Sequence, residues 1–290
     1  MNINNDVLNR FLFDNHHVRG ELVQLEHTIQ TNLKNHQYPA GVEQLLAELL
    51  AATCLLTATL KFEGDITVQL QGDGPVSYLA INGNNLQQMR GIARVTNTKS
   101  AAIAQGLSAL IGKGKMIITI RPKQGEAYQG VVALTADNIA DCLSHYFDVS
   151  EQIPTKIWLY TDTQSKKVAG VLLQLLPDSG SKQQQQEDFD HLCQLTHTIT
   201  TEEVFSLTAE QLLYRLYHQE QVRLFDPQSV SYVCGCSEVK CLQAISQMQP
   251  DEISAILEEQ GSINMTCDYC LTQYQFDQQK LQSLLTATRH

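Results

Sequence analysis

The chain has 290 residues and a mass of 32.4 kDa, which leaves room for one to three domains with ordinary hydrophobic cores. Hydrophobic residues make up 43% of it, so the composition is that of a globular protein. The net charge of −11 provides no overall attraction for nucleic acid or anionic membranes. No apolar run approaches the roughly 18 residues that span a bilayer, and the polar N-terminus does not resemble a signal peptide. We therefore expect a cytoplasmic protein without nucleic-acid or membrane partners.

The first 178 residues predict a mixture of helices and short strands. Residues 42–60 are rich in alanine and leucine and lack proline and glycine, which predicts a helix. The dipeptide Asn82-Gly83 is typical of a hairpin turn and is expected to end a strand. Other expected helices lie at 101–111 and 138–147, and strands are expected at 66–70, 78–81, 91–95, 116–120, 131–134, 156–160 and 168–176. Many short strands with few helices between them favour a largely antiparallel α+β fold.

The composition changes at residues 177–186, where a turn is followed by a polar, glutamine-rich run. We expect the α+β core domain, 1–178, to end here. Two amphipathic helices are predicted next, over 189–199 and 208–217, and the second opens with a Thr-x-x-Gln capping box. Neither is long enough to be stable alone in water, so 179–230 is predicted to be a helical linker region that packs against a neighbour. The remaining segment, 231–290, is a small cysteine-bearing module.

The eight cysteines are distributed unevenly, and five of them fall in the last 57 residues. Two close pairs, Cys234-x-Cys236 and Cys267-x-x-Cys270, are separated by 30 residues. This spacing is typical of a tetrahedral zinc site with four thiolate ligands. A module this small would draw much of its folding free energy from the metal. We predict that these four cysteines bind Zn²⁺ in the reduced form of the protein.

The spacing of the first pair leaves two interpretations open. An ordinary zinc ribbon has Cys-x-x-Cys on both arms, whereas the first arm here is Cys-x-Cys. Because a disulfide can form within each pair, oxidation would remove all four ligands, and the site would then be a switch. A purely structural zinc site fits the same spacing. The other cysteines are expected to be small core residues (Cys54, Cys142 and Cys193) or a spectator at the start of a helix (Cys241).

Two further motifs are interpreted as lacking a chemical role. Residues 106–114 have five residues between their glycines and a glycine after Lys113, so they do not match a phosphate-binding loop. His16 and His17 are far in sequence from the cysteine pairs and are expected to be surface or partly packed side chains.

The paired cysteines resemble those of the redox-regulated 33 kDa heat-shock chaperones of bacteria, and the resemblance runs essentially end to end. It is specific at the four cysteines and extends over many other segments, including Val18-Arg-Gly-Glu-Leu22, Thr57-Ala-Thr-Leu-Lys-Phe62, Ile81-Asn-Gly-Asn84, Met89-Arg-Gly91, Tyr128-Gln-Gly-Val-Val132, Asp188-Phe-Asp-His191 and Arg215-Leu-Tyr-His218. The resemblance implies a holdase that needs no ATP, is not an enzyme, and is inactive while reduced and zinc-bound.

The same resemblance implies how the switch would operate. Oxidants acting together with unfolding heat would form a Cys267–Cys270 disulfide first, and zinc would leave. The linker would then lose its support and expose apolar surface to unfolded client proteins, and a Cys234–Cys236 disulfide would lock that state. Activated members of the family form homodimers.

Two alternatives come from other functional classes. A thiol–disulfide oxidoreductase using Cys267 and Cys270 would need an activated cysteine and usually a thioredoxin-like context, which the sequence does not indicate. A nucleic-acid-binding zinc module would need basic residues, whereas residues 231–290 carry three Lys or Arg against seven Asp or Glu, a net charge of −4.

Overall fold

The computed structural model describes residues 6–59, 63–177 and 181–286, and it divides into two compact units, residues 1–233 and 234–290. Within the described ranges the chain forms eleven helices and three mainly antiparallel sheets, which confirms the predicted α+β class. The helices of the predicted linker region pack within the larger unit. The functional division into 1–178, 179–230 and 231–290 stays a prediction.

The first sheet of the larger unit has the strand order β10-β1-β2-β9-β8, and β11 also pairs with β1. Because successive side chains of a strand point to opposite faces, Leu8 contacts one hydrophobic cluster and Phe11 another. Gly20 of β2 faces the Phe11 ring, which would overlap any side chain at that position. The strands are β1 (Val7–Phe13), β2 (Val18–Leu25), β8 (Thr155–Asp162), β9 (Lys167–Leu175), β10 (Val222–Leu224) and β11 (Gln228–Ser229).

The second sheet has the order β12-β5-β4-β3-β6-β7. All seven strands expected from the sequence are present in the two sheets, with longer bounds than predicted for most of them. Five strands of the two sheets were not predicted: β1, β2, β10, β11 and β12. The strands of the second sheet are β3 (Gly64–Gly72), β4 (Val76–Asn84), β5 (Gln88–Val95), β6 (Gly114–Pro122), β7 (Tyr128–Ala133) and β12 (Ser231–Tyr232).

The expected hairpin turn at Asn82-Gly83 is wrong, since both residues lie inside β4 and the chain turns only after Asn84. Gly83 has another purpose. A Cβ at this position would overlap the sulfur of Met89 on the neighbouring strand β5. The glycine therefore permits close packing between strands rather than a turn.

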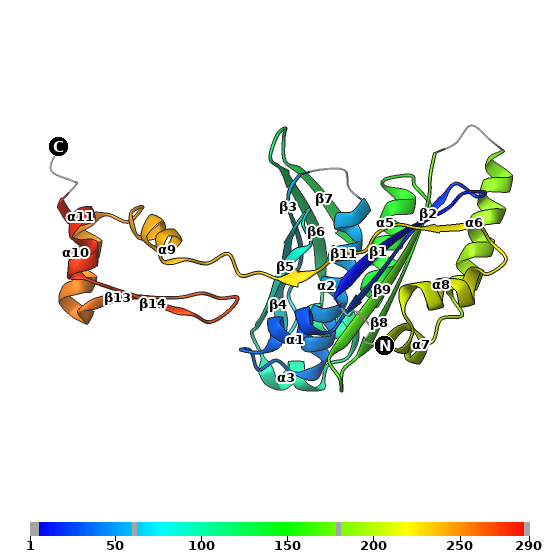
Figure 1. Ribbon diagram of the computed structural model, residues 1–290. Helices are drawn as coiled ribbons and strands as arrows, with labels where there is room; N and C mark the ends of the chain where they lie inside the picture. Colours follow the sequence, from blue (N-terminus) through cyan, green and yellow to red (C-terminus); the bar gives the residue numbers. More distant parts are fainter. Residues whose placement is uncertain (1–5, 60–62, 178–180, 287–290) are drawn as a thin grey trace. The chain divides into compact units, whose positions relative to one another are not determined.

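Helix α2 (Ala40–Thr59) is the centre of the larger unit and lies between its two sheets (Figure 1). It confirms the helix predicted at 42–60, whose last residue lies outside the described ranges. Thirteen of its 20 residues are buried, because both sheets press apolar side chains against it. Glu43 and Glu48 interrupt its apolar run, yet by length and mean composition the helix passes as a candidate membrane span, contrary to expectation; 72% of the qualifying 18-residue window is buried within the protein. Its composition is that of a core helix.

The other helices near the sheets are α1 (His27–Leu33), α3 (Thr98–Ile103), α4 (Gly106–Ile111) and α5 (Ile139–Val149). Helix α5 confirms the helix predicted at 138–147, and the Asn138 side chain caps it by accepting a hydrogen bond from the Asp141 amide. The single helix expected at 101–111 is wrong. The chain breaks it into α3 and α4 because Ala104 is extended and Gly106 has φ = +81°.

Helices α6 (Lys182–Thr196), α7 (Thr201–Ser206) and α8 (Ala209–Tyr217) cover the face of the first sheet opposite α2 (Figure 1). The two predicted linker helices are therefore confirmed, together with the capping box of Thr208 and Gln211. Helix α7 was missed because six residues give too little periodicity, although Thr200 and Glu203 form a capping box that could have revealed it. The glutamine-rich run forms the first turns of α6, so it is helical rather than irregular.

The smaller unit consists of α9 (Glu238–Ile245), α10 (Pro250–Gln260), β13 (Ser262–Thr266), β14 (Gln273–Asp277) and α11 (Gln278–Thr286). Helix α10 begins with a proline at its first position and ends at Gly261, whose φ of +75° suits a glycine after a helix. Among the described residues the buried apolar core has five members: Ile245, Ile253, Ile263, Phe276 and Leu281. So small a core supplies little folding free energy by itself.

Candidate metal centre

Four cysteine sulfurs converge in the smaller unit. Cys234 and Cys236 lie in the irregular segment before α9, and Cys267 and Cys270 lie in the turn between β13 and β14. Their Sγ atoms all lie within 4.8 Å of one another, and all four residues are partly buried. The structure thus brings together the two pairs that the sequence singled out.

The spacing of the sulfurs fits a tetrahedral zinc ion. The Sγ atoms of Cys234 and Cys267 are 3.6 Å apart, and those of Cys236 and Cys270 are 3.5 Å apart. A zinc ion about 2.3 Å from each of four sulfurs would separate them by about 3.8 Å. Each short contact joins one sulfur of the first arm to one of the second. A zinc ion bound here would therefore tie the two arms together.

The turn that carries Cys267 and Cys270 is closed by backbone hydrogen bonds. The amide of Leu271 donates to the carbonyl of Cys267 at 2.8 Å, and the amide of Cys267 donates to the carbonyl of Thr272 at 2.9 Å. This geometry places Leu271 at φ = +57°, in the left-handed region that side chains other than glycine rarely adopt. The turn therefore holds the second arm at a cost in backbone strain.

Side-chain hydroxyl groups contact one sulfur on each arm. The Tyr274 hydroxyl donates a hydrogen bond to Cys236 Sγ at 3.1 Å. Thr272 Oγ1 lies 3.2 Å from Cys270 Sγ. Tyr274 is partly buried, whereas Thr272 is exposed. Hydrogen bonds around a metal site orient the ligand atoms and adjust how much charge they carry.

Three of the four cysteine thiols differ in pKa. Burial opposes ionisation of Cys270, but hydrogen bonds from Thr272 and from neighbouring thiols lower the pKa of Cys270 to about 6. The Tyr274 hydroxyl favours the Cys236 thiolate, yet burial and the adjacent thiols raise the pKa of Cys236 to about 12. Burial also raises the pKa of Cys267. Cys270 therefore ionises more readily than Cys236 or Cys267, and a divalent cation would have to displace the protons of those two thiols.

Charged side chains fix the segment that carries the first arm. The amine of Lys240 donates to the carbonyl of Gly235, between the two cysteines, at 2.6 Å. The amine of Lys280 on α11 donates to Glu238 at 2.6 Å. These contacts hold the start of α9 against the end of the hairpin.

Comparison with known proteins decides the family. The family model described as Hsp33 protein matches residues 6–277, which include both cysteine pairs and all but one of the described elements in full. The chain belongs to the Hsp33 family.

Relatives within the Hsp33 family match along almost their whole length. The 33 kDa chaperonin of Colwellia psychrerythraea (strain 34H) is 65% identical over 289 residues, which cover 98% of this chain and 99% of that protein. The 33 kDa chaperonin of Aeromonas salmonicida (strain A449) is 53% identical over 277 residues, covering 94% and 92%. The crystal structure of a 33 kDa chaperonin from Thermotoga maritima has a TM-score of 0.80 at 20% identity, covering 97% and 98%. The resemblance seen in the sequence is confirmed, and the fold is that of a solved Hsp33.

The four cysteines outside the cluster pack against hydrophobic cores of this Hsp33-family chain, as the sequence predicted for three of them. Cys54 and Cys142 are buried, and burial raises the pKa of both thiols. Cys193 on α6 is partly buried, and burial raises its pKa to about 12. Cys241 packs against the core of the smaller unit. All four lie outside the cluster, so we assign them no role in it.

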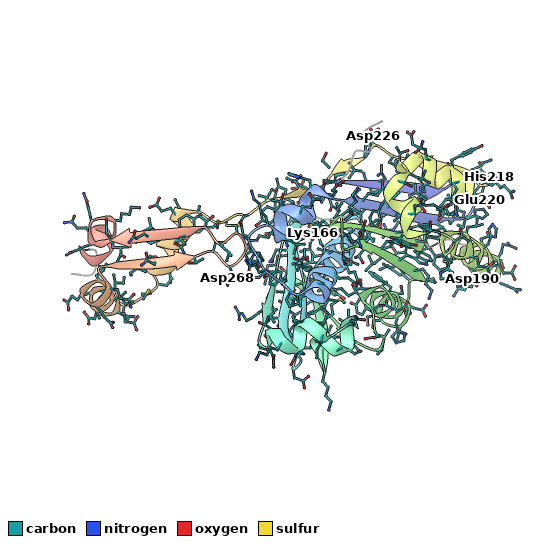
Figure 2. All side chains as sticks on the ribbon, turned by 90° about the horizontal axis from the view of Figure 1, so that it is seen from below. Lys166, Asp190, His218, Glu220, Asp226 and Asp268 are labelled. Atoms are coloured by element: carbon teal, nitrogen blue, oxygen red, sulfur yellow. The ribbon has the colours of Figure 1, made fainter. Side chains whose placement is uncertain are left out.

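A charged network that the sequence did not reveal joins the β1–β2 turn to the linker region. His16 Nε2 is 2.8 Å from Glu220 Oε2, and its Nδ1 is 3.2 Å from Asp188 Oδ2. His191 of α6 contacts the second oxygen of Glu220 at 3.0 Å, and Figure 2 labels Glu220 just beyond α8. His16 is partly buried, as predicted. No sequence signal connects residues 204 positions apart, so only the fold reveals the network.

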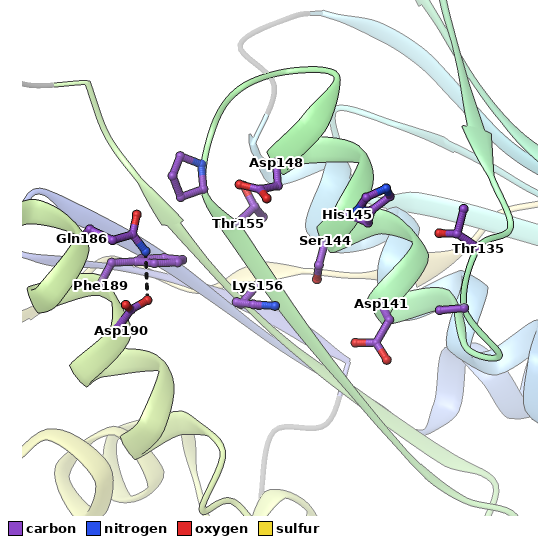
Figure 3. Close-up of a pocket in the computed structure, with 12 residues that line it drawn as sticks. Thr135, Asp141, Ser144, His145, Asp148, Thr155, Lys156, Gln186, Phe189 and Asp190 are labelled. Carbon is purple, nitrogen blue, oxygen red and sulfur yellow. Dashed lines mark hydrogen bonds between the residues drawn. The ribbon is translucent and has the colours of Figure 1, made fainter. Parts of the chain in front are cut away.

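A hollow of about 460 Å³ lies where α6 meets β8 and α5 (Figure 3). Asp141 of α5, Lys156 of β8 and Asp190 of α6 line it, and Gln186 donates a hydrogen bond to Asp190 at 2.9 Å. Phe189, which packs into the cluster beneath the linker helices, also borders the hollow. Solvent therefore reaches the seam between α6 and the sheet.

Proposed function

We propose that the protein is an ATP-independent holdase chaperone of the cytoplasm, inactive when reduced and zinc-bound and activated by oxidation together with unfolding heat. The observation that carries the proposal is the convergence of four cysteine sulfurs within 4.8 Å in a unit with a very small core. Membership of a family whose relatives are named chaperonins supports the chaperone function. Unfolded client proteins are the partners, and the oxidised form is a homodimer.

The four proposed zinc ligands are Cys234, Cys236, Cys267 and Cys270, and the same residues form the redox-active disulfides. A bound zinc ion would hold all four sulfurs as thiolates, the form in which cysteine reacts with oxidants. The Cys267 and Cys270 thiolates together reduce one hydrogen peroxide to two hydroxide ions. One S–S bond forms, the O–O bond breaks, and two electrons pass from sulfur to oxygen. The pair Cys234 and Cys236 reacts afterwards with a second peroxide in the same way.

The proposal connects this chemistry to the linker helices. Loss of the zinc ligands would unfold the smaller unit, because the five buried apolar side chains among its described residues cannot hold it together. Helices α6, α7 and α8 are each too short to be stable alone and rely on the first sheet. If they separate from it, the two surfaces expose a connected apolar set, which suits the capture of unfolded chains. Its members include Phe11, Phe13, Phe189, Leu192, Leu212, Leu216 and Tyr217.

A thiol–disulfide oxidoreductase is the second candidate, and the lowered pKa of Cys270 is the observation in its favour. The surroundings of the pair argue against it. Cys267 and Cys270 lie in a turn between two strands, whereas the redox-active pair of thioredoxin-like enzymes lies at the start of a helix. We therefore favour the chaperone.

Light scattering from a chemically unfolded client protein tests the proposal. The client is diluted into buffer with the full chain in three states: reduced and zinc-loaded, peroxide-treated at 25 °C, and peroxide-treated at heat-shock temperature. We expect only the third sample to suppress aggregation fully, without ATP, and to release its zinc to a colorimetric chelator. Equal scattering in all three samples would contradict a redox switch.

Two variants and one assay sharpen this test. A double variant, Cys267→Ser with Cys270→Ser, should no longer respond to peroxide. Cys241→Ser is the matched control, because Cys241 lies in the same unit but outside the cluster, and it should respond normally. Sustained turnover of a small disulfide substrate by the reduced protein would favour the oxidoreductase instead.

A further inference from the structure

The hydrogen bond from Tyr274 to Cys236 connects the two arms of the cluster without passing through a metal. Tyr274 lies on β14, which follows the Cys267–Cys270 arm, whereas Cys236 belongs to the arm before α9. The hydroxyl oxygen is 3.1 Å from Cys236 Sγ. The Tyr274 ring packs against the hydrophobic core of the smaller unit, and this packing directs the hydroxyl toward the sulfur.

The two hydroxyl contacts of the cluster differ in their exposure to solvent. Tyr274 is partly buried, so its hydrogen bond competes with less water than an exposed contact does. Thr272 is exposed, so water competes for its contact with Cys270. The first arm is therefore held by the more persistent of these two contacts.

We propose that Tyr274 is a positioning residue of the redox switch, whose hydroxyl holds Cys236 in the cluster and slows oxidation of the Cys234–Cys236 arm. The inference rests on the proposed function. A hydrogen bond donated to a thiolate draws negative charge from the sulfur, which weakens its attack on an oxidant. It also fixes the direction of the sulfur, which strengthens metal binding.

The Cys234–Cys236 arm reacts with peroxide in the same stoichiometry as the Cys267–Cys270 arm. One thiolate of the arm attacks a peroxide oxygen to give a sulfenic acid and one hydroxide ion. The second thiolate then attacks the sulfenic sulfur, which forms the S–S bond and releases another hydroxide. When Cys236 is the attacking sulfur, the hydrogen bond that Tyr274 donates to one of its lone pairs must first break. This requirement slows attack by Cys236 and so delays oxidation of the arm.

The variant Tyr274→Phe tests the inference because it removes the hydroxyl and keeps the ring. The full-length protein is loaded with zinc, treated with peroxide and alkylated at intervals, and each disulfide is quantified by mass spectrometry. We expect oxidation of the Cys234–Cys236 arm to accelerate about tenfold and zinc affinity to fall about tenfold. The Cys267–Cys270 arm should react at its usual rate until the metal is lost.

Thr272→Val is the matched variant, since it removes a hydroxyl from the other arm. It should leave the first arm unchanged. A second readout is spectroscopic: in the cobalt-loaded protein, Tyr274→Phe should shift the thiolate-to-cobalt charge-transfer band to lower energy, because one thiolate regains charge. A role in packing alone would not move this band.

The outcomes separate the inference from the proposed function. If wild-type protein switches as proposed but Tyr274→Phe matches it in zinc affinity, band position and order of oxidation, the inference about Tyr274 is wrong and the chaperone switch stands. If wild-type protein binds no zinc, or forms neither disulfide, the proposed function itself fails. Binding of one zinc ion per chain by Tyr274→Phe would show that the variant folds.

Discussion

The ring of Tyr217 on α8 stands edge-on against the ring of Phe13 on β1, with centroids 4.8 Å apart and planes at 89°. The Tyr217 hydroxyl also shares a 2.6 Å hydrogen bond with Thr196 at the end of α6. One side chain therefore attaches two linker helices to the first sheet. If the linker controls access to client-binding surface, this contact opposes activation.

We expect Tyr217→Ala to loosen the linker by about 3–5 kcal/mol, the usual cost of removing a buried aromatic side chain. Tyr217→Phe should cost only about 1 kcal/mol, because it loses the hydrogen bond and keeps the ring contact. Hydrogen exchange of α6 to α8 measures the effect, and client holding should then need less oxidant. Tyr214→Ala, which removes a side chain 75% exposed on the same helix, is the control and should change little. Equal exchange in Tyr217→Ala and wild type would contradict an attachment role.

The attachment of the linker should also depend on pH through His16. Burial by itself would lower the pKa of His16, but hydrogen bonds and charge from Glu220 and Asp188 outweigh it and raise that pKa above 6.5. A histidine whose pKa is raised by folding stabilises the folded state fully below its unfolded pKa. That contribution is lost as the pH rises through the raised value.

Glu220 and Asp188 have the opposite dependence. Burial by itself would raise the pKa of both carboxyl groups, but His16 and other partners outweigh it and lower both values. Their contribution to the stability of the folded state is therefore lost as the pH falls through those lowered values. We expect linker protection in hydrogen exchange to be greatest at mildly acidic pH and to decline toward alkaline pH. His16→Gln should flatten that profile, whereas His218→Gln, at an exposed position after α8, should leave it unchanged. A wild-type profile without any decline above neutral pH would contradict the network.

The strained turn of the second arm gives a third prediction. Leu271 occupies a left-handed conformation with φ = +57°, which costs a side-chain-bearing residue about 1 kcal/mol relative to glycine. Leu271→Gly should therefore stabilise the reduced, zinc-loaded unit by up to about 1 kcal/mol and slow its zinc release on heating. Glu258→Gly, in the exposed interior of α10, should destabilise the same unit instead. The temperature of zinc release, followed with a colorimetric chelator, distinguishes the two, and faster release from Leu271→Gly would count against strain.

Removal of zinc should unfold the smaller unit alone. Its core has five buried apolar side chains among the described residues, whereas α2 lies buried between two six-stranded sheets. We expect a chelator added to the reduced protein to abolish exchange protection in β13, β14 and α10. Helix α2 should remain protected. Persistent protection of β13 and β14 in metal-free protein would show that the unit folds without zinc.

Much of the candidate site could be predicted because its signal is local. Each cysteine pair spans three or four residues, and that spacing alone indicated a shared metal ion. The capping box of Thr208 and Gln211 and the amphipathic pattern after it located α8 for the same reason. The turn predicted at Asn82-Gly83 was wrong because packing between strands, and not the local sequence, determines the conformation there. Gly83 looked like a turn residue, but it makes room for the Met89 sulfur of a neighbouring strand.

The sequence by itself determined the α+β class, the buried helix α2, the amphipathic linker helices and the four candidate metal ligands. Each of these depends on a pattern of residues that lie close together along the chain. Only the tertiary structure decided which surface the linker covers and which groups hold it there. The contacts of Tyr217 with Phe13, and of His16 with Glu220, join residues about 200 positions apart. It likewise decided that a tyrosine on β14 reaches Cys236. Such contacts depend on how strands pair and helices pack, and no local pattern in the sequence records them.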